Sequence, residues 1–104
     1  MKNLTKEKIF VYGTLSDPEV QKHVFGRVVS SVICVLDGYK RSKILIDGDI
    51  YPIIIPRKKG KVLGSIIEVT TSELKKIDKY ETSAYRRKKV VLKNNLVAWV
   101  YVKR

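Results

Sequence analysis

The feature that most constrains the fold is a junction in which the apolar run of residues 9–15 passes directly into Ser16-Asp17-Pro18-Glu19. The apolar, β-branched and aromatic start of the run predicts a buried strand, and Asp17-Pro18 predicts the start of a helix. Gly13 lies between them, where it permits a turn or a close backbone approach that a Cβ would block. Such a junction has free N–H groups and a favourable helix dipole, so it can receive a carboxylate or phosphate. The same pattern also fits an ordinary strand-to-helix corner that binds nothing.

The chain has 104 residues, which predicts one domain spanning 1–104 with a single modest core. Hydrophobic residues make up 44% and charged residues 31%, as in a soluble globular protein with a heavily charged surface. No apolar run is long enough to span a membrane, and no apolar signal core follows the first lysines. We therefore expect a cytoplasmic protein that does not contact membranes; the sequence carries no signal for its oligomeric state.

Cysteine and histidine are scarce, since Cys34 and His23 are single representatives of their types. One cysteine excludes an intramolecular disulfide and a four-cysteine zinc site. Cys34 lies in an apolar run and is expected to be a small buried residue, and His23 a partly exposed helix residue. With so few of these residues, a Cys-His or Ser-His-Asp nucleophile system has little to build from.

The net charge is +12, from 22 Lys and Arg against 10 Asp and Glu. This excess makes binding of nucleic acid or another polyanion an alternative function. The basic residues are scattered in small groups, however, and no nucleic-acid module is recognisable, so a solvated basic surface is the simpler interpretation.

The other elements are predicted from periodicity and breakers. In chain order they are a helix over 18–25, strands over 28–36 and 39–46, a proline-interrupted edge or irregular segment over 50–56, a strand over 62–69, a helix from a capping box at 70–73 to about 81, and strands over 88–93 and 96–103. Turns are expected at 37–38, 47–49, 58–61 and Asn94-Asn95, and Gly64 predicts a bulge or a close backbone approach. The pattern indicates an α+β domain with more strands than helices.

The second helix carries two acids near its buried side. Leu74 and Ile77 define the inward stripe, and the helical period places Asp78 and Glu81 on or beside it. A carboxylate in an apolar setting has a raised pKa, which suits proton transfer. Alternatively, the helix frays before Glu81 and both acids pair with nearby Lys or Arg.

Several motifs together resemble the gamma-glutamylcyclotransferase-like family, within it the branch typified by plant avirulence-induced-gene proteins. The motifs are Val11-Tyr12-Gly13-Thr14-Leu15 with Asp17-Pro18-Glu19-Val20, Leu36-Asp37-Gly38-Tyr39-Lys40-Arg41, Tyr51-Pro52, Gly60 with Val62 and Gly64, Leu74 with Ile77-Asp78-Lys79-Tyr80-Glu81, and Tyr85-Arg86. They span roughly residues 10–102 in the family's order. Residue 82 is Thr where the family often has Gly or an acid, which leaves the leaving-group side of the site open.

The resemblance implies a small mixed β-barrel flanked by about two helices. It also implies an enzyme that cyclises a small γ-glutamyl amine or γ-glutamyl amino acid to 5-oxoproline and releases the amine. Because the nucleophile of this reaction belongs to the substrate, the resemblance implies no metal and no cofactor. The backbone at Tyr12, Gly13, Thr14 and Leu15 would hold the α-amino-acid end of the γ-glutamyl group, and Glu81 would accept and donate the proton. Tyr85 follows by a short loop, and its phenol either reaches the substrate or packs into the barrel. The alternative is a non-catalytic basic module whose binding of polyanions would weaken steeply with salt.

Overall fold

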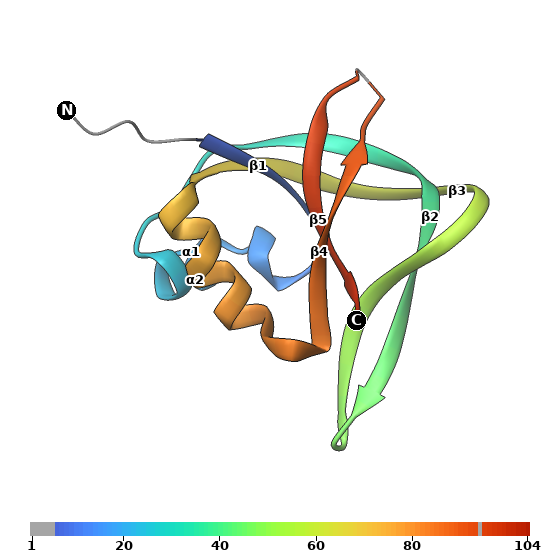
Figure 1. Cartoon of the computed structure of the whole chain (residues 1–104), viewed down its shortest axis with the longest axis horizontal. Coiled ribbons are helices and arrows are strands. Elements are labelled where there is room, and N and C mark those ends of the chain that lie inside the picture. Colours follow the sequence, from blue (N-terminus) through green and yellow to red (C-terminus); the bar gives the residue numbers. More distant parts are fainter. Residues whose placement is uncertain (1–5, 94) are drawn as a thin grey trace.

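The computed structural model describes residues 6–93 and 95–104, which form one curled five-stranded sheet and two α-helices (Figure 1). The elements are β1 (Lys6–Val11), α1 (Pro18–Phe25), β2 (Ser31–Ile46), β3 (Asp49–Thr70), α2 (Thr71–Glu81), β4 (Tyr85–Val91) and β5 (Val97–Lys103). Two short 3₁₀ turns, Thr14–Ser16 and Thr82–Ala84, follow β1 and α2.

The strand order is β2-β3-β1-β5-β4, so β1 is the central strand. It pairs antiparallel with β3 and parallel with β5, where Ile9 lies opposite Trp99. The sheet curls into a half-barrel, and the Lys88 ammonium on β4 donates a 3.0 Å hydrogen bond to the Tyr39 hydroxyl on β2, the opposite edge strand. The predicted α+β fold, a small mixed barrel-like sheet with two helices, is confirmed. The last strand, β5, is an interior strand, because it lies between β1 and β4.

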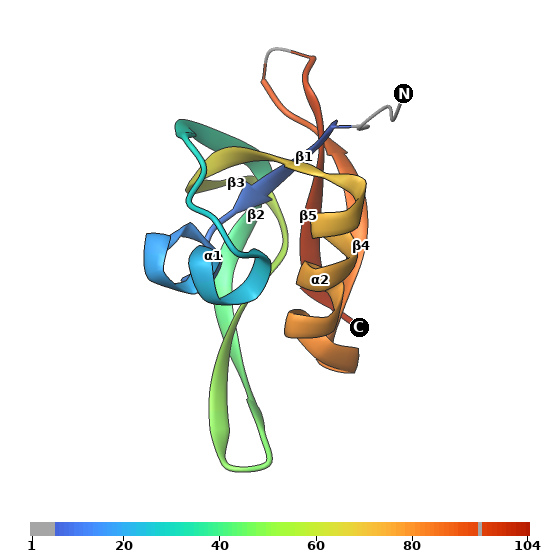
Figure 2. The same cartoon turned by 90° about the vertical axis from the view of Figure 1, so that its left-hand side faces the viewer.

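Two apolar clusters lie on opposite sides of the sheet, as the alternation of side chains along a strand requires. On β5, Tyr101 packs in the cluster that includes Leu74 and Ile77 of α2. Ala98 and Val100 pack in the second cluster, inside the curl, with Phe10 of β1. Both faces of the central strands are therefore buried, and the helices cover one face only (Figure 2).

Strands β2 and β3 are much longer than predicted. The turns expected at 37–38 and 58–61 are wrong: at 37–38 the β2–β3 register shifts and Gly38 has φ of 87°, and at 58–61 β3 continues with Lys59 at φ of 64°. Both breaks are absorbed as irregularities because pairing resumes on either side of them. Pro52 and Pro56 pair only with β2 and lie outside the stretch of β3 that pairs with β1. Because β3 has a strand on one side only at these residues, the missing proline N–H groups interrupt no pairing with a second strand.

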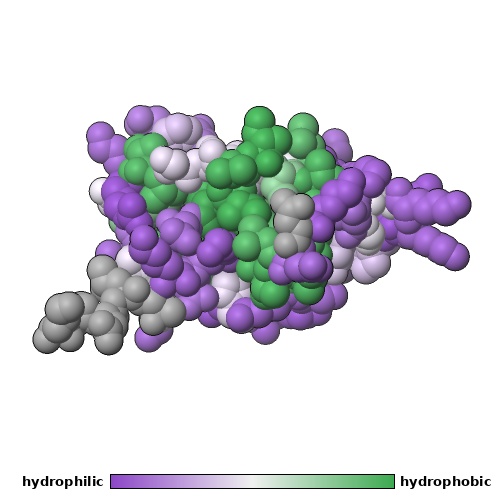
Figure 3. All heavy atoms as spheres, turned by 90° about the horizontal axis from the view of Figure 1, so that it is seen from above, coloured by the Kyte–Doolittle hydropathy of each residue, from purple (hydrophilic) through white to green (hydrophobic). Residues whose placement is uncertain are grey.

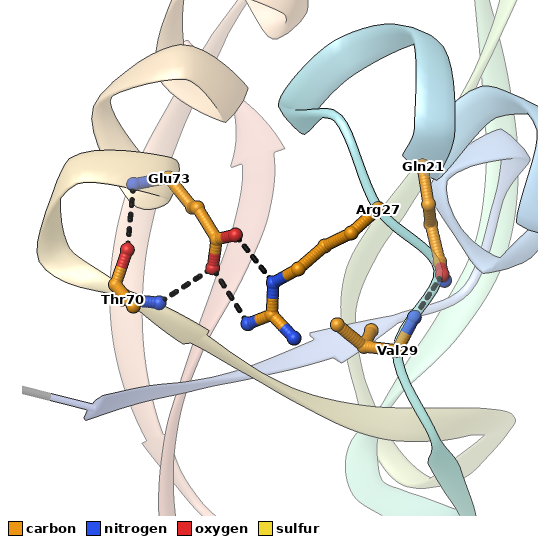
Figure 4. A network of polar contacts seen from close by, with 5 residues as sticks. All are labelled: Gln21, Arg27, Val29, Thr70 and Glu73. Atoms are coloured by element: carbon orange, nitrogen blue, oxygen red, sulfur yellow. Dashed lines mark hydrogen bonds and ion pairs between the residues drawn. The ribbon is translucent and has the colours of Figure 1, made fainter.

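Both helices have the ends that their sequences predict. Asp17 caps α1 by accepting a hydrogen bond from Glu19 N, and Gly26 ends it in the left-handed conformation. Thr70 and Glu73 form the expected capping box of α2. Glu73 also receives two hydrogen bonds, of 2.6 and 2.9 Å, from Arg27, which ties the segment after α1 to the start of α2 (Figure 4).

Gly64 makes the close backbone approach predicted for it, since a Cβ there would lie 2.5 Å from the Val11 carbonyl oxygen. The strand end that carries the 12–15 loop is thus pressed against β3. In the β4–β5 connection Asn95 has φ of 60°, as expected for a tight turn, whereas Asn94 lies outside the described residues.

The surface is not uniformly charged. Figure 3 shows apolar residues gathered in the middle of one face, with hydrophilic residues on either side. Exposed apolar residues include Val32 and Ile33 on β2 and Val91 and Val97 at the ends of β4 and β5. In the described part of the chain, no helix is both long and apolar enough to cross a bilayer.

Candidate active site

A pocket of about 400 Å³ opens between the end of β1, the tip of the β2–β3 hairpin and the end of α2. Its walls come from residues 10–15, 50–52 and 80–82, with Tyr85 and Tyr101. The predicted binding loop and Glu81 therefore line one pocket although they are far apart in the sequence. Its volume is in the range of sites that hold small molecules.

The loop at 12–15 is ordered by its own hydrogen bonds. Ser16 donates to the Gly13 carbonyl through its backbone N (3.0 Å) and its hydroxyl (2.6 Å), and Asp17 N donates to the Thr14 carbonyl (2.9 Å). In the part of the chain that the structure describes, none of these bonds uses the N–H groups of Thr14 and Leu15, which begin the 3₁₀ turn. Binding of an anionic group by these N–H groups stays a prediction.

The structure does not show the expected need for glycine at residue 13, a turn or close backbone approach that a Cβ would block. Its φ is −134°, open to any residue, and an added Cβ would meet only Pro52 Cγ at an ordinary 3.5 Å. Since Pro52 belongs to the facing wall, a side chain at residue 13 would occupy pocket volume rather than clash with the backbone. Gly13 keeps the site open.

Gln21 is a positioning residue that the sequence analysis missed. Its side chain is only 2% exposed; it donates to the Leu15 carbonyl (3.0 Å) and accepts from Val29 N (3.1 Å), the contact drawn in Figure 4. A buried amide satisfied on both sides fixes the end of the loop to α1. Its spacing of four residues from Phe25, on the inward face, was the available signal.

Glu81 is the last residue of α2, half-buried in the pocket wall. Burial, together with the negative charge of Asp78, raises the pKa of its carboxyl to about 7. The C-terminal end of the helix dipole disfavours a negative charge in the same direction. Within residues 6–93 and 95–104 the carboxylate has no hydrogen-bond partner and no ion pair, so it is available to a ligand.

Asp78 behaves differently, and here the alternative of ion pairing is correct. Its two oxygens accept from Arg87 at 2.7 and 3.0 Å, and the Tyr101 hydroxyl donates to Oδ1 at 2.6 Å. Asp78 therefore joins α2 to β4 and β5 and is fully engaged. Arg87 is the basic partner of Asp78, and alternation along β4, with Tyr85 and Arg87 on one face, could have indicated it.

The hydroxyls of two predicted site tyrosines are committed to the protein. Tyr12 donates to the Tyr101 carbonyl (2.7 Å), and burial is the main cause that raises its pKa. Tyr85 donates to the Pro52 carbonyl (2.6 Å), and burial followed by the Glu81 charge raises its pKa to about 12. Both phenols stay neutral near pH 7, and they shape the pocket walls.

Strain is concentrated directly after Glu81. Thr82 has φ of 63° and ψ of −172°, a region that L-residues with a branched Cβ rarely adopt. This conformation explains why a glycine would suit residue 82. At Thr82 the chain also changes direction from α2 into the second 3₁₀ turn, so Glu81 is the last residue before this change of direction.

The pocket offers no evident metal site, since among the described residues no cluster of three or more His, Cys, Asp or Glu could hold an ion. What the walls do provide is free backbone donors on the loop, one carboxyl that titrates near neutrality, and a largely aromatic and apolar surround. Such a pocket can orient a small molecule that bears a carboxylate and can move a proton on it.

The fold and the pocket together define a class: small α+β proteins in which a curled mixed sheet and two helices border a pocket of about 400 Å³. Comparison with known families makes the assignment specific. The chain belongs to the family described as gamma-glutamyl cyclotransferase, AIG2-like, which it matches over residues 9–104. The resemblance inferred from the sequence motifs is thereby confirmed.

Relatives of known sequence or structure agree. AIG2-like protein C of Arabidopsis thaliana is 41% identical over 83 residues, covering 79% of this chain and 47% of that protein. A solution structure of an Arabidopsis thaliana protein superposes with a TM-score of 0.78 at 30% identity, over 99% of this chain and 65% of that one. A structure titled gamma-glutamyl cyclotransferase has a TM-score of 0.76 at 14% identity, covering 96% and 68%, and shows the shared fold. The chain spans about half the length of the curated relatives it matches.

Proposed function

We propose that this protein is a gamma-glutamyl cyclotransferase, which converts a γ-glutamyl amine or γ-glutamyl amino acid to 5-oxoproline and the free amine. The observation that carries the proposal is that Glu81, with a pKa near 7 and no partner in the described chain, lines the same pocket as the free donors of the 13–15 loop. Family membership supports the reaction class, and the activity of this chain is our inference.

The substrate's α-carboxylate binds the backbone N–H groups of the loop. Those donors supply partners for the anion without a basic side chain, because they are left unpaired at the start of the 3₁₀ turn. The γ-carbonyl then lies toward Glu81. Held in this way, the γ-glutamyl chain is folded back on itself, which removes much of the entropic barrier to ring closure.

Glu81 in its ionised form takes a proton from the α-ammonium group. The freed amine attacks the γ-carbonyl carbon, a new C–N bond closes the five-membered lactam, and the original amide C–N bond breaks. The protonated Glu81 gives its proton to the departing nitrogen as that bond breaks. The carboxylate then takes the second proton from the new lactam nitrogen and passes it to the released amine, which leaves as an ammonium ion. Atoms balance without water, metal or cofactor, and a carboxyl with a pKa near the working pH serves both steps.

The tyrosines have positioning roles in this scheme. Tyr85 holds Pro52 against the pocket through its 2.6 Å hydrogen bond, and Tyr80 shares a 2.9 Å hydrogen bond with Thr14 of the loop. Both link parts of the chain that must stay at fixed separation for the loop and Glu81 to act on one substrate.

The test is release of 5-oxoproline and amine from a panel of γ-glutamyl amides and dipeptides, followed by chromatography. Glu81→Gln keeps the shape of the side chain and removes the base, so turnover should fall by about 10²–10⁴-fold, the usual contribution of general acid–base catalysis. Glu68→Gln is the matched control, because Glu68 is on the outer part of β3, paired with Lys8, and does not line the pocket. Equal turnover by the Glu81→Gln variant and the native protein would refute the proposal.

Two other sequence-based expectations stay predictions: binding of polyanions by the basic surface, and a cytoplasmic location. The first is open to a salt titration, since binding driven by phosphate contacts must weaken steeply as salt rises.

A further inference from the structure

The pocket differs in charge from the rest of the molecule. The chain has 22 Lys and Arg residues, yet among the described residues none of them lines this pocket, and Glu81 is the only ionisable acid or base of its walls apart from tyrosines. Arg41, which approaches the loop, is used by the carbonyls of Tyr12 (2.6 Å) and Leu63 (2.7 Å) and lines a separate depression. An anionic group on the substrate can therefore be matched only by the backbone donors of the loop.

The part of the pocket away from the loop is apolar and aromatic. The buried floor is made by Phe10 and Val11, and the rim by Ile50, which is 68% exposed, and Tyr80, which is 38% exposed. Tyr51 follows Ile50 on the hairpin and also lines the pocket, so this wall combines aliphatic and ring surfaces. An apolar substituent that displaces water from this wall would bind more tightly, because it buries apolar surface there.

We propose, building on the proposed function, that the amine released by this protein carries an apolar or aromatic group and no carboxylate. With the γ-glutamyl part held at the loop and Glu81, the amine substituent extends toward Ile50 and Tyr51. A carboxylate on it would lose water without gaining a cation and would be repelled by ionised Glu81. A ring or an alkyl chain would pack against the rim.

A matched pair of substrates isolates this effect: γ-glutamyl-2-phenylethylamide and γ-glutamylphenylalanine, which differ by one carboxylate. We expect kcat/KM for the amide to exceed that for the dipeptide by about tenfold or more, since one unmatched charged group costs at least that much. Binding of both compounds to the Glu81→Gln variant, measured by calorimetry, should show the same order of affinity without any turnover.

A charge placed at the rim gives the second test. Ile50→Lys supplies the missing cation and should raise kcat/KM for γ-glutamylphenylalanine, so that the preference shrinks severalfold. Val91→Lys is the matched control, an exposed strand valine outside the pocket, and it should leave the preference unchanged while adding the same net charge.

The outcomes separate the two proposals. If neither compound nor any other γ-glutamyl compound releases 5-oxoproline, the proposed function is refuted. If 5-oxoproline forms and kcat/KM is the same for the dipeptide and the amide, the proposed function stands and the inference about the amine is refuted. Equal affinity of the Glu81→Gln variant for the two compounds would refute that inference in the same way. An equal effect of Ile50→Lys and Val91→Lys would likewise refute the role of the rim.

Discussion

Replacing Glu81 by Gln should make the protein more stable at high pH while it removes activity. The pKa of this carboxyl rises from 4.5 in an exposed setting to about 7 in the folded protein, because burial penalises its charge. Below pH 4.5 the group is protonated in both the folded and the unfolded chain, so it carries no penalty. As the pH rises toward 7 the unfolded chain loses the proton first, and the folded state becomes progressively less stable.

The magnitude follows from the two pKa values. Each pKa unit corresponds to about 1.4 kcal/mol, so the rise from 4.5 to about 7 gives a full penalty of at most about 3.5 kcal/mol well above pH 7. Glutamine is neutral at all pH values. The variant should therefore gain stability relative to the native protein as the pH rises. The difference between their free energies of unfolding, variant minus native, should be up to about 3 kcal/mol larger at pH 8 than at pH 4.5.

Urea unfolding followed by the fluorescence of Trp99, the only tryptophan, measures this difference at both pH values. Glu68→Gln is again the control: Lys8 lowers the pKa of Glu68, so its loss should not stabilise the protein at high pH. If the effect of Glu81→Gln on stability is the same at pH 4.5 and pH 8, the Glu81 carboxylate is not disfavoured by burial and the reasoning fails.

Three further predictions concern the same pocket. The rate of 5-oxoproline formation should fall as the pH drops through about 7, because the base must be ionised, and a profile flat down to pH 5 would exclude Glu81 as the base. Tyr85→Phe should leave the Pro52 carbonyl without its donor, lowering the free energy of unfolding by about 1 kcal/mol and raising KM more than it lowers kcat, as measured by urea unfolding and initial rates. Thr82→Gly should relieve the positive φ and stabilise the fold by about 1 kcal/mol, offset in part by glycine's entropy; destabilisation in urea would show that this backbone is unstrained.

Local patterns predicted the helices well. The Asp17 cap with Gly26, and the box of Thr70 and Glu73, are interactions within a few residues, so their chemistry is complete in the sequence. Periodicity also placed Glu81 on the pocket side, because α2 does not fray before it.

Features that depend on tertiary contacts could not be predicted from the sequence as well as the helices were. The turn residues at 37–38 and 58–61 could not be distinguished from bulges, since that depends on whether the partner strand continues beyond them. Nothing in the sequence distinguishes the paired Asp78 from the free Glu81, because the partner that engages Asp78 comes from β4. Gln21 was missed because a buried polar residue becomes meaningful only when both of its partners are known.

The arrangement of β3 divides the chain into parts that can change separately. Between residues 49 and 61 this strand pairs with β2 alone, whereas the stretch from Ser65 to Thr70 pairs with β1 and so supports the loop. Insertions, deletions or substitutions near the hairpin tip alter residues 50–52 without disturbing the ladder that holds β1. The hairpin side of the pocket can therefore change in sequence while the support of the loop is kept, and the hairpin tip is the place to begin directed evolution of altered ligand preference.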